Sequence, residues 1–317
     1  MKRKHWNMGR RICLFAWIFV SLLCITKTVD AAEKINQKAS AGMTIQYREE
    51  GAQFRLYKVA KIASNGTFTP TKDFENYPVK WNGLNSEGWR LLAETLDAYV
   101  ARDNISPVKT LVIDENRSAT AEKLEVGFYL VVGTRASDSE LDIRPTPFLI
   151  SLPSESKKGT LDYFPVVNAK MTVDDSFLKD SIKRRVIKNW DDEGVEDKRP
   201  DKIEIELLKD GEVEETVTLN KANNWSYTWK DLAGGYEWKV IEKDVPEDYT
   251  MTVNLDNKTF VVTNTAKDKK TSQPPGDDHM LPQTGQLWWP VPFLALFGMG
   301  FFIIGWVRRK TLGEDDE

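Results

Sequence analysis

The residues with the clearest chemical potential are a lysine, a glutamate and an asparagine, each within a strand-like segment. Residues two apart on a strand share a face, so each of these polar residues lies among apolar neighbours. The neighbours are Val186 and Trp190 for Lys188, Tyr236, Trp238 and Val240 for Glu242, and Phe260 and Val262 for Asn264. An isolated buried lysine or glutamate costs several kcal/mol unless it is neutralised or paired. Two interpretations follow. In the first, Lys188 and Glu242 lie at strand ends, where they reach water or form an ordinary salt bridge. In the second, the three side chains meet in a buried site.

Other common catalytic chemistries lack their residues. The only cysteines are Cys13 and Cys24 and the only histidines are His5 and His279, all near the ends of the 317-residue chain. Ser-His-Asp, Cys-His and histidine-zinc sites are therefore not expected, and neither are a disulfide, a metal or a cofactor. The net charge is −4 without a basic block in the central part, which argues against a nucleic-acid partner. No carboxylate pair stands out, so we predict no enzyme.

The N-terminus has the three parts of a secretory signal peptide. Residues 1–11 are rich in lysine and arginine, residues 12–25 are apolar, and small residues follow. Signal peptidase accepts small side chains, so we expect cleavage between Ala31 and Ala32. Both cysteines then lie in the removed segment.

Two other interpretations of this segment are weaker. An uncleaved anchor would need roughly 20 apolar residues, and this run is shorter. Lipid attachment at Cys24 would need a small residue before it, whereas Leu23 stands there.

The C-terminus combines an apolar run over 287–307 with a basic tail at 308–310. The run is long enough to span a bilayer, and the tail would stay in the cytoplasm. Immediately before the run, the chain reads Leu281, Pro282, Gln283, Thr284, Gly285. This pentapeptide resembles the LPxTG sorting signal of Gram-positive surface proteins. The resemblance implies that a sortase attacks the carbonyl of Thr284, releases the chain from Gly285 onward, and joins Thr284 to an amine of peptidoglycan or of another pilin subunit.

These ends predict a secreted protein anchored covalently to the cell wall, with a membrane helix only in its precursor. We expect a signal peptide (1–31), an N-terminal β domain (40–172), a second β domain (181–266), a flexible linker (267–280) and a sorting signal (281–317) with its helix. The fold class is mainly β, with two tandem immunoglobulin-like sandwiches.

The first of these domains has four strand-like segments and one amphipathic helix. The strands are expected at 52–62, 127–132, 147–152 and 162–167. The helix would be capped by Ser86, and its apolar face consists of Trp89, Leu92, Ala93, Leu96, Tyr99 and Val100. Segments 51–60, 127–131 and 147–153 resemble the N-terminal domain of Gram-positive pilin subunits.

The second domain contains seven short strands, which is typical of an immunoglobulin-like sandwich. They are expected at 186–190, 202–208, 214–219, 225–229, 236–241, 250–255 and 259–263. Segments 186–192, 198–200, 205–211, 223–229, 240–242 and 262–265 resemble the Cna B-type domain. In that family a lysine and an asparagine form an intramolecular isopeptide bond, assisted by an acidic residue.

The resemblance assigns these roles to Lys188, Asn264 and Glu242. An apolar pocket favours the neutral amine and the protonated carboxyl. The hypothesis is that neutral Lys188 attacks the side-chain carbonyl of Asn264, while protonated Glu242 polarises the amide and relays a proton as ammonia leaves. The first domain has Lys58 on an apolar face but no acid within 127–133, so we predict no isopeptide bond there.

The pilin resemblance also suggests Lys170 as the lysine that joins subunits. In shaft pilins the motif that carries the linking lysine ends in Tyr-Pro-Lys. Here Ala169 replaces the proline of that motif, and the upstream tryptophan is missing. A solvated lysine at a strand end is the alternative. This departure favours a minor or basal pilin, or a wall-linked monomer, over a shaft pilin. The alternative function is a monomeric adhesin that binds a host or matrix protein.

Overall fold

The computed structural model describes residues 34–136, 143–155, 160–173 and 179–268. The predicted signal peptide with Ala31 and Ala32, most of the linker, and the sorting signal at 281–285 lie outside these residues. In the described part of the chain, no helix is both long and apolar enough to cross a membrane. The predicted span at 287–307 is not among the residues that this finding covers.

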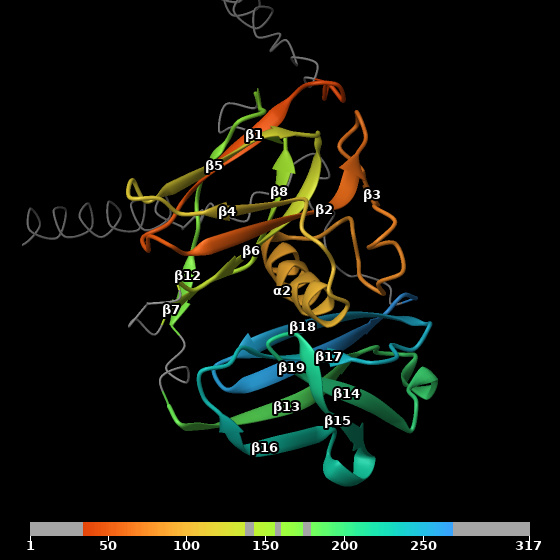
Figure 1. Ribbon diagram of the computed structural model, residues 1–317. Coiled ribbons are helices and arrows are strands. Elements are labelled where there is room, and N and C mark those ends of the chain that lie inside the picture. The colour runs from red at the N-terminus through yellow and green to blue at the C-terminus, as the bar shows by residue number, and fades with distance from the viewer. Residues whose placement is uncertain (1–33, 137–142, 156–159, 174–178, 269–317) are drawn as a thin grey trace, which may run out of the picture. The chain divides into compact units, whose positions relative to one another are not determined.

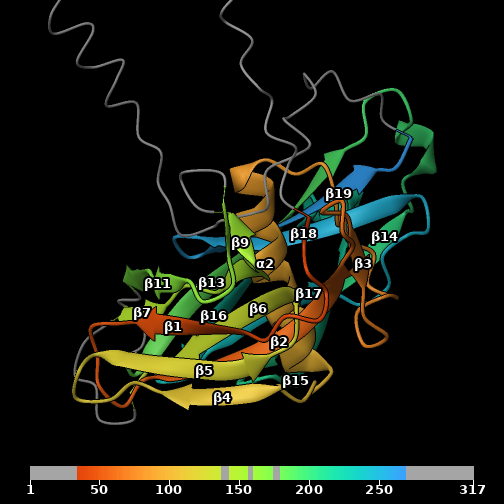
Figure 2. The same ribbon diagram turned by 90° about the horizontal axis from the view of Figure 1, so that it is seen from above.

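The N-terminal sandwich (35–173) packs two sheets face to face. One sheet has the order β3 (Phe68–Pro70), β2 (Gln53–Ile62), β6 (Gly127–Thr134), β8 (Phe148–Leu152), with β4 (Lys109–Val112) also paired to β2. The other has the order β11 (Val166–Asn168), β1 (Ala41–Gln46), β5 (Ser118–Leu124). Strands β1 and β5 lie over β2 in both views (Figures 1 and 2). Alternating apolar residues such as Met43, Ile45, Phe54 and Leu56 form the core between the sheets.

The helix α2 (Ser86–Arg102) covers the other face of the larger sheet (Figure 1). Its predicted apolar residues are buried, and the rings of Trp89 and Phe128 meet edge to face. The cap differs from the prediction: Asn85, not Ser86, accepts a hydrogen bond from the backbone of Gly88. Either side chain can cap a helix, and the chain enters the helix one residue earlier than the pattern indicated.

Two polar residues of α2 are also buried. The Thr95 hydroxyl accepts a hydrogen bond from the backbone N–H of Val253 at 2.9 Å, and Asp97 forms an ion pair with Lys239. These partners come from the C-terminal strands, so α2 is covered on more than the single face that its apolar pattern indicates.

The strand predicted at 162–167 is interrupted. The structure has β10 (Leu161–Asp162) paired with β9 (Ser154–Glu155), and β11 begins only at Val166. Pro165 lies between them and has no backbone N–H to donate to a ladder. Two short strands, β7 (Ile143–Pro145) and β12 (Met171–Val173), pair with each other. Like β1, β3, β4, β5 and β9, they were not predicted.

The C-terminal sandwich (179–268) contains all seven predicted strands. One sheet has the order β16 (Ser226–Ala233), β13 (Ser181–Asp191), β19 (Thr259–Ala266), β18 (Tyr249–Asp256). The other has the order β15 (Glu212–Asn220), β14 (Lys202–Lys209), β17 (Trp238–Glu242). The first and last strands, β13 and β19, run parallel, and Trp190 is the register partner of Asn264. This pairing joins the two ends of the sandwich within one sheet.

Candidate functional site

The two sheets of the C-terminal sandwich bring Lys188, Glu242 and Asn264 together. Lys188 lies on β13 and Asn264 on the neighbouring β19, with side chains on the same inner face. Glu242 is the last residue of β17 in the facing sheet. The period of two in each strand turns all three side chains toward the core.

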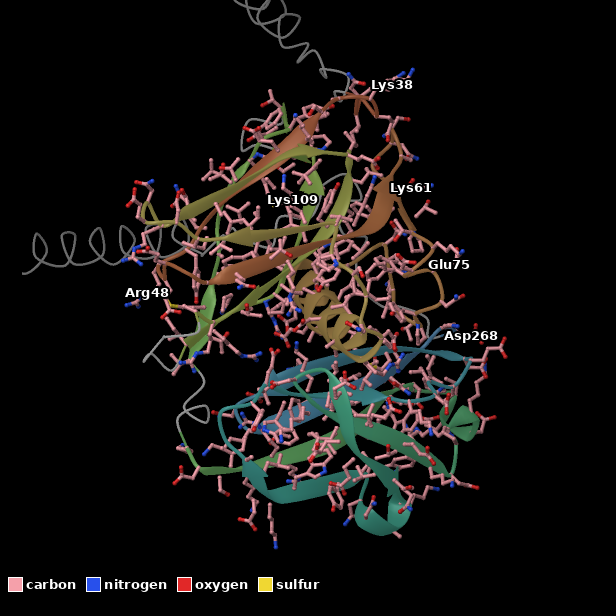
Figure 3. All side chains as sticks on the ribbon, viewed as in Figure 1. Lys38, Arg48, Lys61, Glu75, Lys109 and Asp268 are labelled. Atoms are coloured by element: carbon pink, nitrogen blue, oxygen red, sulfur yellow. The ribbon has the colours of Figure 1, made fainter. Side chains whose placement is uncertain are left out.

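The three side chains form one hydrogen-bonded chain through the carboxylate. Lys188 Nζ lies 2.7 Å from Glu242 Oε2, and Asn264 Nδ2 lies 3.0 Å from Glu242 Oε1. The side chains of Lys188 and Glu242 are fully buried, as is Asn264. Lys38 and Lys61, which are labelled in Figure 3, are instead exposed at the edge of the fold. The prediction that Lys188 and Glu242 reach water is therefore wrong, whereas the alternative of a salt bridge between them agrees with the structure.

One polar atom of this site has no partner. Within the described residues, Asn264 Oδ1 is buried and accepts no hydrogen bond. A buried carbonyl oxygen without a donor costs free energy, and such atoms in native proteins call for an explanation. Here the unpartnered carbonyl belongs to the amide that lies against the carboxylate of Glu242.

Burial sets the protonation state of the lysine. It lowers the pKa of Lys188 to about 8, although Glu242 opposes this shift through its charge and its hydrogen bond. About a tenth of a group with that pKa is the neutral amine at pH 7, compared with well under a thousandth of a free lysine. The site thus holds a nucleophilic amine, an amide and a carboxylate in contact with the nitrogens of both.

A cluster of aromatic rings adjoins this site through Trp190. The ring of Trp190 lies 4.6 Å from Lys188 Nζ. It contacts the rings of Trp225 and Tyr249 edge to face, each at 5.3 Å between centroids. The hydroxyl of Tyr249 donates to Asp192.

Sequence reasoning gave Asp192, Arg199 and Tyr249 no role. Asp192 and Arg199 do fall within segments that carry the family resemblance, and that was the available signal. The strand pattern also misplaced Tyr236. This residue is exposed and precedes β17, where it lies under Lys209 Nζ.

Lys58 of the N-terminal sandwich is in a different setting. Its Nζ lies 2.6 Å from Glu125 Oε2, and the Glu125 side chain is 84% exposed. Glu125 lies two residues before the 127–133 segment, which contains no acid. The carboxylate of this pair lies in water, whereas that of Glu242 is fully buried, and the absence of an isopeptide bond there remains the prediction.

Lys170 is exposed and lies between β11 and β12. Its backbone carbonyl accepts a hydrogen bond from the N–H of Thr146. The side chain is accessible, as both readings of Lys170 require. Among the described residues, no group of three or more His, Cys, Asp or Glu side chains is placed to hold a metal ion.

The C-terminal part of the chain is thus a β-sandwich in which a lysine of the first strand and an asparagine of the last strand contact one buried glutamate of the facing sheet. Residues 184–265, which include the triad, match the family model of the Cna protein B-type domain.

Among curated proteins, the collagen adhesin of Staphylococcus aureus is 33% identical over 121 residues, which is 36% of this chain and 10% of the adhesin. The chain thus spans a small part of that relative. A single B repeat unit of the S. aureus collagen-binding surface protein aligns over 72% of this chain and 98% of its own, with 20% identity and a TM-score of 0.26. The major pilin SpaD of Corynebacterium diphtheriae aligns over 77% of this chain and 71% of its own, with 16% identity and a TM-score of 0.31.

Proposed function

We propose that this chain is a pilin-like surface protein of a Gram-positive cell wall, and that its C-terminal sandwich forms a Lys188–Asn264 isopeptide bond by itself. The observation that carries the proposal is the buried contact of Lys188 and Asn264 with Glu242. The match of residues 184–265 to the Cna protein B-type domain supports it.

The reaction is an acyl transfer within one chain. The neutral Nζ of Lys188 attacks Cγ of Asn264, a new C–N bond forms, and the bond from Cγ to Nδ2 breaks. One proton from Nζ must reach Nδ2, so that it leaves as ammonia. Glu242 faces Nζ with one oxygen and Nδ2 with the other, which supports a role as the proton carrier. Each molecule reacts once, so the process is self-modification without turnover.

Intact-mass measurement of the purified chain tests this reaction. We expect the mass to be lower than that of the sequence by one ammonia, with the missing mass in a linked peptide pair containing residues 188 and 264. Glu242→Ala should keep the full mass. The matched control is Glu125→Ala, which removes an exposed carboxylate from the ion pair with Lys58 and should lose ammonia as the wild type does. Full mass in the wild type, or equal loss in Glu242→Ala, refutes the proposal.

The chain would reach the wall through Leu281, Pro282, Gln283, Thr284 and Gly285, with a sortase as its partner. The acceptor amine would belong to peptidoglycan or to another pilin subunit. Denaturing immunoblots of enzymatically released wall material distinguish the two. A high-mass ladder that collapses in Lys170→Ala but persists in Lys61→Ala, a control at another exposed lysine, supports a pilus linked through Lys170. A single band near the mature mass supports a wall-anchored monomer.

The second candidate is a monomeric adhesin, favoured by the sequence similarity to a collagen adhesin. The matched segment is a small part of that relative, so the ligand has to be tested directly. Saturable binding of the full chain to immobilised collagen, absent with immobilised serum albumin, supports this candidate. Equal retention on both surfaces argues against collagen as the ligand.

A further inference from the structure

The indole of Trp190 closes the site over the reacting lysine. Its ring lies 4.6 Å from Lys188 Nζ, on the same face of β13 two residues along. The indole Nε1 is buried and, within the described residues, has no hydrogen-bond partner. The ring therefore gains no polar anchor of its own, and its position depends on what packs against it.

Two aromatic rings pack against Trp190. Trp225 and Tyr249 contact it edge to face, with interplanar angles of 80° and 69°. Trp225 has a φ of +51°, in the left-handed region that bulky residues rarely occupy. The carbonyl of Trp225 accepts a hydrogen bond from the backbone N–H of Lys188 at 2.8 Å. Such strain persists only where the surrounding structure enforces it, and residues of this kind cluster at functional sites.

A buried carboxylate fixes the second of these rings. The hydroxyl of Tyr249 donates to Asp192 Oδ2 at 2.9 Å, and Arg199 Nε donates to the same oxygen at 2.7 Å. A second guanidinium nitrogen of Arg199 donates to Oδ1 of Asp192, whose side chain is fully buried. A bidentate arginine–carboxylate pair has a specific geometry. It fixes the position of the Asp192 carboxylate, and thereby the position of the Tyr249 hydroxyl that donates to it.

We propose that Trp190 is a positioning residue for the Lys188–Asn264 reaction, and that Asp192, Arg199 and Tyr249 form a bracket that keeps its ring over the amine. The inference rests on the proposed function. The ring keeps bulk water from Nζ and so maintains the neutral nucleophile. The charged groups that act directly on Lys188 are Glu242 and Asp192. Asp192 in turn interacts with Arg199 and Tyr249, and Glu242 interacts with Tyr99 of α2.

The test follows the rate of bond formation against pH. The full chain is recovered from inclusion bodies in urea, diluted into buffers of stepped pH, quenched with acid at intervals, and analysed for ammonia loss. Burial is the largest cause of the low pKa of Lys188, so admitting water in Trp190→Ala should raise that pKa. We expect the midpoint of the rate profile to move up by about one pH unit or more, with about a tenfold slower reaction at neutral pH for each unit.

Three further variants separate positioning from stability. Trp190→Phe retains an aromatic cover and should restore most of the rate. Tyr249→Phe keeps the ring but loses the hydrogen bond to Asp192, and should shift the midpoint upward by less than Trp190→Ala does. The matched control is Trp229→Ala, which removes another buried tryptophan of the sandwich, packed against Tyr227. It should destabilise the sandwich and keep the wild-type midpoint.

The outcomes are distinct. A wild-type rate and midpoint in Trp190→Ala overturn the inference, as does an equal midpoint shift in Trp229→Ala. If Trp190→Ala does not fold, the Tyr249→Phe variant becomes the test. An unshifted midpoint of its rate profile overturns the proposal that Asp192, Arg199 and Tyr249 hold the ring of Trp190. If the wild type loses no ammonia at any pH, the proposed function itself fails.

Discussion

Asn264→Ala removes the proposed cross-link while leaving the ion pair of Lys188 and Glu242 in place. A bond between residues 188 and 264 closes a loop of about 75 residues, which in the chain-entropy model is worth roughly 4.5 kcal/mol. We therefore expect the free energy of unfolding of the C-terminal sandwich to fall by about 4.5 kcal/mol.

Calorimetry measures this loss. For a sandwich of about 90 residues, a loss of about 4.5 kcal/mol corresponds to a fall in Tm of roughly 18–36 °C. Hydrogen exchange of peptides from residues 181–266 assigns the transition to this part of the chain. The matched control is Asn189→Ala, on the outer face of β13, where the change should stay within about 0.5 kcal/mol.

The reasoning fails under one clear result. Suppose that the wild-type mass is one ammonia below that of its sequence, and that the Asn264→Ala mass equals that of its own sequence. If the two proteins still melt within about 5 °C of each other, the cross-link does not stabilise by restricting the unfolded chain.

Three other predictions concern charge and packing. Asn264→Ala keeps Lys188 unlinked, and in the unlinked fold burial lowers the pKa of Lys188 from 10.5 to about 8. Between these values the unfolded chain binds more protons, so the stability of the variant should rise with pH. In the linked wild type Lys188 no longer titrates. The difference in free energy of unfolding between wild type and variant should therefore shrink by about 3 kcal/mol across this pH range. Calorimetry at stepped pH measures this as a smaller difference in Tm. Glu125→Gln breaks an exposed pair and should change the free energy of unfolding by less than about 1 kcal/mol, measured in urea; a larger loss would mean that Lys58 depends on this partner. Gly133→Ala would place a Cβ 2.3 Å from Pro145 Cβ and 2.8 Å from the ring of Phe54, so we expect about 1–3 kcal/mol of destabilisation in urea, and an unchanged midpoint would show that the sheets can separate to admit a methyl group.

The strands of the C-terminal sandwich were predictable because each carries its own alternating pattern. Val186, Val262 and their apolar neighbours mark the inner face without reference to the rest of the fold. The same local logic failed where a single residue decides an element boundary. Pro165 interrupts a strand that its neighbours favour, and Asn85 replaces Ser86 as the cap because both are good capping residues.

The partners of the polar residues were less predictable. Thr95 and Asp97 look solvent-exposed on an amphipathic helix, yet both are buried against C-terminal strands. Likewise Asp192, Arg199 and Tyr249 are up to 57 residues apart in sequence, and only the tertiary structure, in which β19 lies between β13 and β18, joins them.

By itself the sequence determined the mainly β fold, the seven strands of the second sandwich, and the faces on which Lys188, Glu242 and Asn264 lie, because alternation is a local property. Whether those three side chains reach water or meet in a buried contact was decided only by the tertiary structure. Contact across two sheets depends on the register of β13 with β19 and on the facing position of β17, and no residue carries that information alone.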